Sequence, residues 1–96
     1  MKLWLDDIHQ KPKGYDLHAK TVEEAWTYII NLRITHISFD HDLGKNKLTG
    51  YDLACRIEKA AYQGIRYVKT WDIHSANPVG AARIKMAMES FDKAVL

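Results

Sequence analysis

Acidic side chains stand at the ends of two apolar segments of this 96-residue sequence. Asp6 and Asp7 close the first segment, and Asp40 and Asp42 close another further along the chain. Carboxylates gathered in one place raise each other's pKa values unless a cation compensates their charge. Hard oxygen ligands suit Mg²⁺, which takes a few carboxylates together with water and phosphate oxygens. We therefore expect these four carboxylates to hold a divalent cation, Mg²⁺ or Mn²⁺, although each pair alone also fits a turn.

Two histidines lie inside such polar clusters. His41 sits between the acidic residues of the second cluster, and His74 follows a third apolar segment. Histidine titrates near neutral pH, which suits proton transfer to a leaving oxygen. We expect His74 and His41 to act in catalysis together with Asp40, the alternative for each histidine being an orienting hydrogen bond. The remaining three histidines have no such placement.

Phosphate-binding groups are expected close to these clusters. The pair Asn77-Pro78 is a strong helix start, because Asn caps well and Pro tolerates the first helical position. A helix N-terminus favours phosphate, so we expect Ser75 and Asn77 to bind it. Lys45 and Lys47, in the loop that follows the second acidic cluster, would attract an anionic ligand.

Strand and helix patterns alternate along the chain. We expect strands over residues 2–5, 15–19, 34–39 and 67–73, helices over 21–31, 50–62 and 77–91, and a last edge strand over 93–96. This alternation predicts β-α-β crossovers and a parallel sheet covered on both faces. The carboxyl ends of parallel strands share one edge. The three polar clusters should therefore meet.

Charge, apolar runs and cysteine content narrow the class of protein and its partners. Fourteen Lys and Arg against twelve Asp and Glu give a net charge of +2, too small to argue for nucleic acid on total charge alone. The apolar runs fall far short of the ~20 residues of a membrane helix, and Cys55 is the only cysteine. We expect one domain over residues 1–96, a cytoplasmic location, and neither a membrane nor a DNA partner. Trp4 and Trp26 are expected in the core.

The same residues resemble a known family. The acidic pair, the strand ending in Asp40, Gly50 ten residues on and the Ser75-Ala76 element are similar to the site of response-regulator receiver domains. More closely, the motifs Phe-Asp-His-Asp-Leu-Gly at 39–44 and His-Ser-Ala-Asn-Pro at 74–78 resemble the cyclic-phosphate processing receiver-like family of bacteria and phages.

The resemblance implies a fold and an activity. The implied fold is a three-layer, doubly wound flavodoxin-like α/β sheet of order 2-1-3-4-5. It should be reduced, because Asp7 and Asp40 are only 33 positions apart and the first receiver helix must be lost or shortened. The implied activity is a metal-dependent phosphoesterase acting on cyclic phosphates, such as the 2′,3′-cyclic ends of RNA or nucleotides. The expected partner is a phosphate-containing small molecule or an RNA end.

Two alternatives remain open at this stage. The chain could be a non-catalytic receiver-like module that binds a phosphorylated ligand or partner, or a stand-alone receiver that accepts a phosphoryl group on Asp40. Receivers carry a lysine after their last strand, whereas Lys93 falls before it here, so hydrolysis fits better than phosphorelay. Within hydrolysis, direct attack by Asp40 and attack by water both remain open. An exposed edge strand would permit a homodimer.

Overall fold

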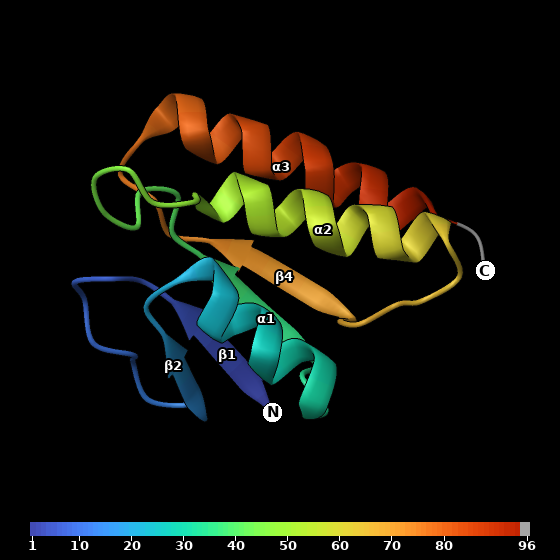
Figure 1. Cartoon of the computed structure of the whole chain (residues 1–96), viewed down its shortest axis with the longest axis horizontal. Helices are drawn as coiled ribbons and strands as arrows, with labels where there is room; N and C mark the ends of the chain where they lie inside the picture. The colour runs from blue at the N-terminus through green and yellow to red at the C-terminus, as the bar shows by residue number, and fades with distance from the viewer. Residues whose placement is uncertain (95–96) are drawn as a thin grey trace.

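The computed structural model describes residues 1–94. Its elements, in chain order, are β1 (Lys2–Leu5), β2 (Leu17–Ala19), α1 (Val22–Asn31), β3 (His36–Phe39), α2 (Gly50–Tyr62), β4 (Thr70–Ile73) and α3 (Pro78–Lys93) (Figure 1). All four strands are parallel and lie in the order β2-β1-β3-β4. The predicted α/β class and reduced receiver-like sheet are therefore confirmed.

One face of the sheet forms the core. Side chains alternate along a strand, so Leu3 and Leu5 of β1 point to the same side as Ile37 and Phe39 of β3, their partners in register. All four are fully buried. The helices pack their apolar sides against these residues. They contribute Ile29, Leu53, Ile57, Ile84 and Phe91 to the core. None of the described helices is long and apolar enough to cross a membrane.

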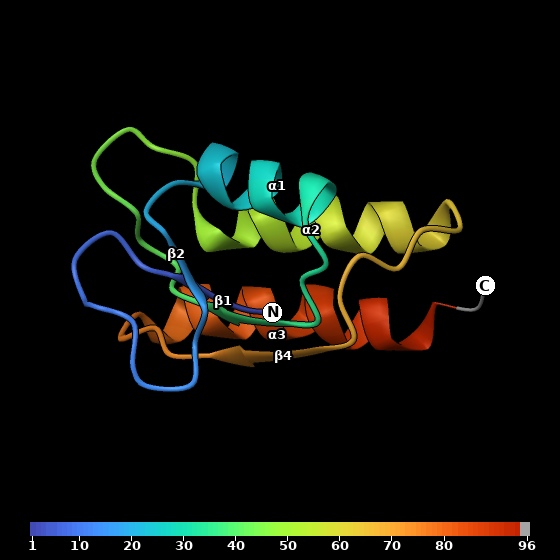
Figure 2. The ribbon, with the colours of Figure 1, turned by 90° about the horizontal axis from the view of Figure 1, so that it is seen from below.

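All three helices lie along the same side of the sheet (Figures 1 and 2). The crossovers through α1 and α2 both advance in one direction across the sheet, and right-handed crossovers of that kind place their helices on one face. The connection from β1 to β2 runs the other way and contains no helix. The first receiver helix is therefore lost, as predicted, and the described residues form two layers where three were expected.

The predicted edge strand over 93–96 is wrong for its first two residues. Helix α3 continues through Lys93, and the backbone N–H of Ala94 donates to the carbonyl of Phe91. The Arg66 guanidinium also donates to the carbonyls of Phe91 and Ala94, at 3.1 and 3.4 Å, and so closes the helix end. Residues 95–96 of that predicted strand lie outside the described part of the chain.

Side-chain caps fix where α1 and α2 begin. Thr21 Oγ1 accepts the N–H of Glu24 at the start of α1, while the Glu24 carboxylate accepts the N–H of Lys20, one residue further back. A reciprocal capping box starts α2, where Thr49 and Asp52 each accept the other's backbone N–H. The start of α2 is thereby fixed beside the end of β3.

The second face of the sheet carries Trp4, and no helix within residues 1–94 covers it. The prediction that Trp4 belongs to the core is wrong, because the pleat of β1 turns Leu3 and Leu5 inward and Trp4 outward. Its indole meets Tyr15 edge to face at 5.2 Å. Tyr15 in turn places its hydroxyl 3.2 Å from His36 Nε2. This face is therefore polar and aromatic.

His36 makes the stability of the fold depend on pH. Burial and the nearby Lys2 ammonium lower the pKa of His36, so the folded state favours the neutral imidazole. Below the unfolded-state pKa, near 6.5, the unfolded chain takes up this proton more readily, and the free energy of unfolding falls. We expect His36→Gln to flatten the pH dependence of urea midpoints between about pH 5 and 7. An unchanged slope in the variant would contradict this origin.

Candidate metal centre

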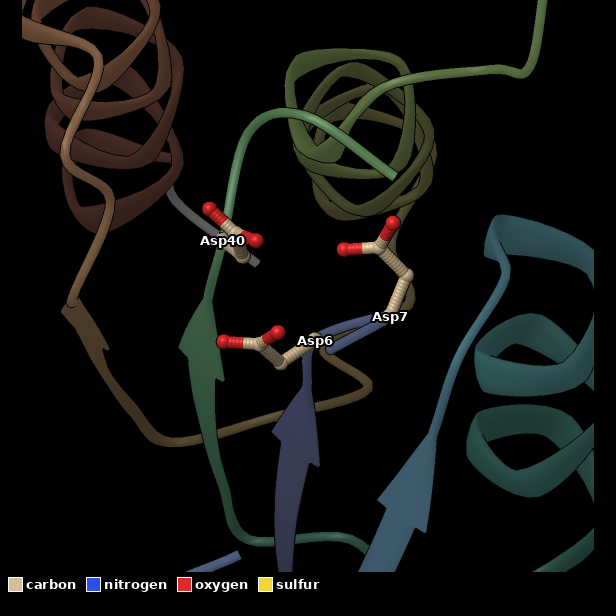
Figure 3. Close-up of side chains that lie close together, drawn as sticks. All are labelled: Asp6, Asp7 and Asp40. Atoms are coloured by element: carbon tan, nitrogen blue, oxygen red, sulfur yellow. The ribbon is translucent and has the colours of Figure 1, made fainter. Parts of the chain in front are cut away.

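Three carboxylates meet at the carboxyl edge of the sheet (Figure 3). Asp6 and Asp7 follow β1, and Asp40 follows the adjacent strand β3. Each offers one oxygen atom, and these atoms all lie within 4.8 Å of one another. The structure thus brings together three of the four predicted metal ligands.

The carboxylates border a cavity of about 540 Å³. His9, Lys45 and His74 also line it. A larger hollow of about 650 Å³ lies elsewhere, lined by residues of α2 and α3 such as Tyr51 and Arg83. Size therefore does not single out the site, whereas the convergence of charged groups does.

Asp6 is the most heavily hydrogen-bonded member of the cluster. Its Oδ1 accepts the backbone N–H groups of Ile8 and His9, both at 2.8 Å. Its Oδ2 lies 3.1 Å from His74 Nε2 and 3.2 Å from His9 Nδ1. Burial raises the pKa of Asp6, but the two backbone bonds and the two imidazoles outweigh it and leave the pKa below its usual range. Asp6 is thus held as a carboxylate.

The pKa of Asp40 is raised, in contrast to that of Asp6. Burial raises its pKa, and the negative charge of Asp6 raises it further. One backbone bond, from the N–H of His41 at 2.8 Å, offsets part of this. No lysine or arginine within residues 1–94 makes an ion pair with Asp40. The described residues therefore compensate its charge only in part, through His74 and the His41 N–H.

Asp7 supplies the observation that tests whether a cation fits. Its Oδ1 is buried and has no hydrogen-bond partner among the described residues. A buried acceptor without a donor is costly, and a carboxylate more so than a neutral group. A divalent cation between Asp6, Asp7 and Asp40 would satisfy this oxygen and reduce the repulsion at Asp40. The donor set, all carboxylate oxygen, fits Mg²⁺ or Mn²⁺.

His74 is held rigidly from three sides. Its Nδ1 lies 2.8 Å from Ser38 Oγ, and its Nε2 binds Asp6. Its ring stacks on Trp4 with centroids 3.6 Å apart and planes 8° from parallel. Burial lowers the pKa of His74, although the hydrogen bond to Asp6 works against this. The predicted catalytic histidine is therefore in the site, with both ring nitrogens already in hydrogen bonds.

Asp42 and His41 lie to one side of the carboxylate cluster. The Asp42 side chain is 67% exposed and lies 2.9 Å from His41 Nδ1. The hydrogen bonds from His41 and Asn77 lower the pKa of Asp42. The His41 ring packs against the first turn of α3, where a Cβ on Gly80 would come within 2.2 Å of it. These two predicted site residues thus join the β3 end to α3, and His41 does not line the cavity.

Only two of the four predicted phosphate ligands line this cavity. Lys45 and Asn77 line the cavity. Ser75 turns its hydroxyl to the backbone N–H of Asn77, at 3.1 Å. Lys47 lines a separate hollow beside the start of α1. Of the four, Lys45 is the one that brings positive charge to the cavity.

Asn77 also has a structural role that a substitution should reveal. Its Oδ1 accepts the N–H of Gly80 at 3.0 Å and caps α3. We expect Asn77→Ala to lower the free energy of unfolding by about 1 kcal/mol. Asn77→Ser retains a capping oxygen and loses the amide bond to Asp42, so it should recover most of this loss. Equal losses in urea unfolding of the two variants would mean that the cap is not the cause.

His9 is the site residue that the sequence did not reveal. Its imidazole reaches Asp6 because the Asp6 carboxylate accepts two backbone N–H groups of the residues that follow and turns the chain back on itself. Asp commonly makes such local turns. An Asp at a strand end with His three positions later was therefore the available signal.

Comparison with known proteins identifies one family. The family model of the cyclic-phosphate processing receiver domain matches residues 1–90. No curated protein and no solved structure matches the chain significantly. Because the family match extends over almost the entire sequence and includes every residue of the carboxylate cluster, the chain belongs to the cyclic-phosphate processing receiver domain family.

Proposed function

We propose that this protein is a metal-dependent phosphoesterase that opens cyclic phosphates, such as the 2′,3′-cyclic ends of RNA or nucleotides. The observation that carries the proposal is the cluster of Asp6, Asp7 and Asp40, in which one buried Asp7 oxygen has no partner among the described residues. The family to which the chain belongs is described by its processing of cyclic phosphates. A carboxylate cluster beside a cavity suits chemistry on such a group.

The proposed reaction is hydrolysis of one phosphodiester bond. A water oxygen forms a bond to phosphorus while the bond from phosphorus to one ribose oxygen breaks, and the proton lost by water is balanced by one gained by that ribose oxygen. A divalent cation would polarise the phosphoryl oxygens and so favour attack. Asp6, Asp7 and Asp40 would hold this ion, and Lys45 would attract the anionic substrate.

The proton for the leaving oxygen would come from an imidazole that lines the cavity. His74 and His9 both meet this condition, and both contact Asp6. His74 is fixed by Ser38 and Trp4, whereas His9 has one ring nitrogen outside its contact with Asp6. His41 packs against α3 and is less well placed for this step.

Phosphorus NMR of a 2′,3′-cyclic mononucleotide tests the proposal. We expect a phosphomonoester signal to appear with protein and Mg²⁺, and to be absent with EDTA or with Asp40→Asn. The shift of the product also identifies which ester bond opened. Mg²⁺ binding by calorimetry without turnover of a mononucleotide or of an RNA with a cyclic end would contradict the proposal and favour a receiver-like binding module.

A further inference from the structure

We infer that the cation and the His9 side chain compete for Asp6, so that ion binding releases the His9 imidazole into the cavity. The inference rests on the ion of the proposed function. A carboxylate has about four lone-pair positions for hydrogen bonds or ligands. In Asp6 all four are taken, two on Oδ1 by backbone N–H groups and two on Oδ2 by the imidazoles of His9 and His74. An ion that binds Asp6 must therefore displace one of these partners.

The two backbone bonds on Oδ1 are the least able to leave. Both are 2.8 Å long, shorter than either imidazole contact, and both belong to the turn that begins the β1–β2 connection. Breaking them would require the backbone of Ile8 and His9 to move. That backbone is further fixed because the Trp4 indole N–H donates to the carbonyl of His9 at 3.2 Å.

Of the two imidazoles, His9 is the one free to leave. Its side chain is 76% exposed and Asp6 is the partner of its ring in the structure. The His74 side chain is 19% exposed, stacks on Trp4 and has a second hydrogen bond, to Ser38. Rotation of the His9 side chain breaks one contact, whereas removal of His74 breaks three. Because the His9 carbonyl and N–H remain bound, its release is a side-chain rotation within a fixed turn.

Release would change what lines the cavity. In the structure Nδ1 of His9 is directed at Asp6. Once the ion takes that position, both ring nitrogens become available to a bound phosphate, on the same side of the cavity as the carboxylates. Ion binding and the presentation of His9 to the substrate are then one event, and the position of the His9 ring reports whether the ion is bound.

Calorimetric affinities for Mg²⁺ provide the first test. His9→Ala removes the competitor, so we expect it to bind Mg²⁺ roughly two- to tenfold more tightly than the wild-type protein, the factor that one hydrogen bond contributes. His9→Asn retains an N–H donor near the position of Nδ1 and should bind with wild-type affinity. Gln10→Ala, at an exposed position of the same loop, is the matched control and should also leave the affinity unchanged.

Histidine side-chain NMR provides a second, independent readout. Addition of Mg²⁺ should shift the ring resonances of His9 strongly, while those of His36, at the far end of the strands, stay in place. Tighter binding by His9→Ala with this selective shift supports the inference. Weaker or unchanged binding by His9→Ala, or a His9 ring that does not respond, overturns the inference alone. Absence of Mg²⁺ and Mn²⁺ binding by the wild-type protein overturns the proposed function and the inference together.

Discussion

Gly50→Ala is expected to lower the free energy of unfolding by about 2–3 kcal/mol, the cost of forcing a methyl group into a packed site. A Cβ at this position would lie 1.9 Å from the carbonyl oxygen of Asp40 and 3.2 Å from Ile84 Cδ1. The backbone cannot easily withdraw, because the Gly50 N–H donates to the carbonyl of His41 at 2.9 Å. The gain of about 1 kcal/mol that alanine brings to a helix is too small to compensate.

The same substitution should damage the carboxylate cluster. The added Cβ must push the backbone carbonyl of Asp40 away, so the Asp40 carboxylate shifts relative to Asp6 and Asp7. Gly80→Ala is the matched comparison, because its Cβ would meet the His41 ring, a side chain, where a Cβ at Gly50 would meet backbone. We expect Gly50→Ala to lose more stability in urea and more Mg²⁺ affinity than Gly80→Ala. The reverse order would contradict the role given to Gly50.

Asp40→Asn is expected to abolish Mg²⁺ binding and turnover while making the ion-free protein more stable, by about 0.5–2 kcal/mol, the usual range of a single stabilising change. Burial and the Asp6 charge raise the pKa of Asp40, so its charged form costs the folded state stability at neutral pH. Asparagine removes the charge and keeps the oxygen that accepts the His41 N–H. Function and stability should thus change in opposite directions.

Asp42→Asn is the control for this pair of effects. Hydrogen bonds from His41 and Asn77 lower the pKa of Asp42, so its charge stabilises the folded state. We expect Asp42→Asn to leave the stability unchanged or slightly reduced, and to retain Mg²⁺ binding. Unfolding in EDTA and calorimetry with Mg²⁺ measure both quantities. Destabilisation by Asp40→Asn in EDTA would show that Asp40 is not under electrostatic strain.

The raised pKa of Asp40 also makes the stability of the fold depend on pH. Because its folded-state pKa is raised, the folded protein binds this proton more tightly than the unfolded chain. Its contribution to stability is therefore lost as pH rises through that raised pKa, and it returns on acidification. Asp40→Asn should remove this part of the pH dependence in the absence of metal.

Local signals in the sequence were sufficient for the helices and for the carboxylate cluster. The apolar periodicity predicted the helices, and Asn77 caps α3 as the sequence indicated. Asp residues at two strand ends had to converge once those strands were parallel neighbours, as β1 and β3 are. The helices depend on residues close together in the sequence, and the cluster follows once the strand order is known. Both could therefore be predicted.

Features that depend on tertiary packing were beyond the sequence. Trp4 fits a buried strand by hydrophobicity, and its actual position depends on which face of the sheet the helices cover. The separation of Asp42 from the cluster arises because His41 and Asn77 bind its carboxylate. His9 enters the site through a turn that forms only when Asp6 accepts its backbone N–H. Such choices are settled by partners distant in sequence or by the geometry of one loop.

The three-residue strand β2 forms the edge of the sheet beside β1 and contacts the site through Asp6. Asp6 donates its N–H to the carbonyl of Ala19 at 3.0 Å, and the Asp6 carbonyl lies 2.7 Å from His18 Nε2. A short edge strand with one face uncovered opens at a lower free energy than the core, and its amides exchange with solvent through that local opening. Hydrogen exchange at the Asp6 amide should therefore follow fraying of β2 instead of global unfolding. A ligand bound to Asp6 would slow that exchange, and so tighten the edge of the sheet from the site outward.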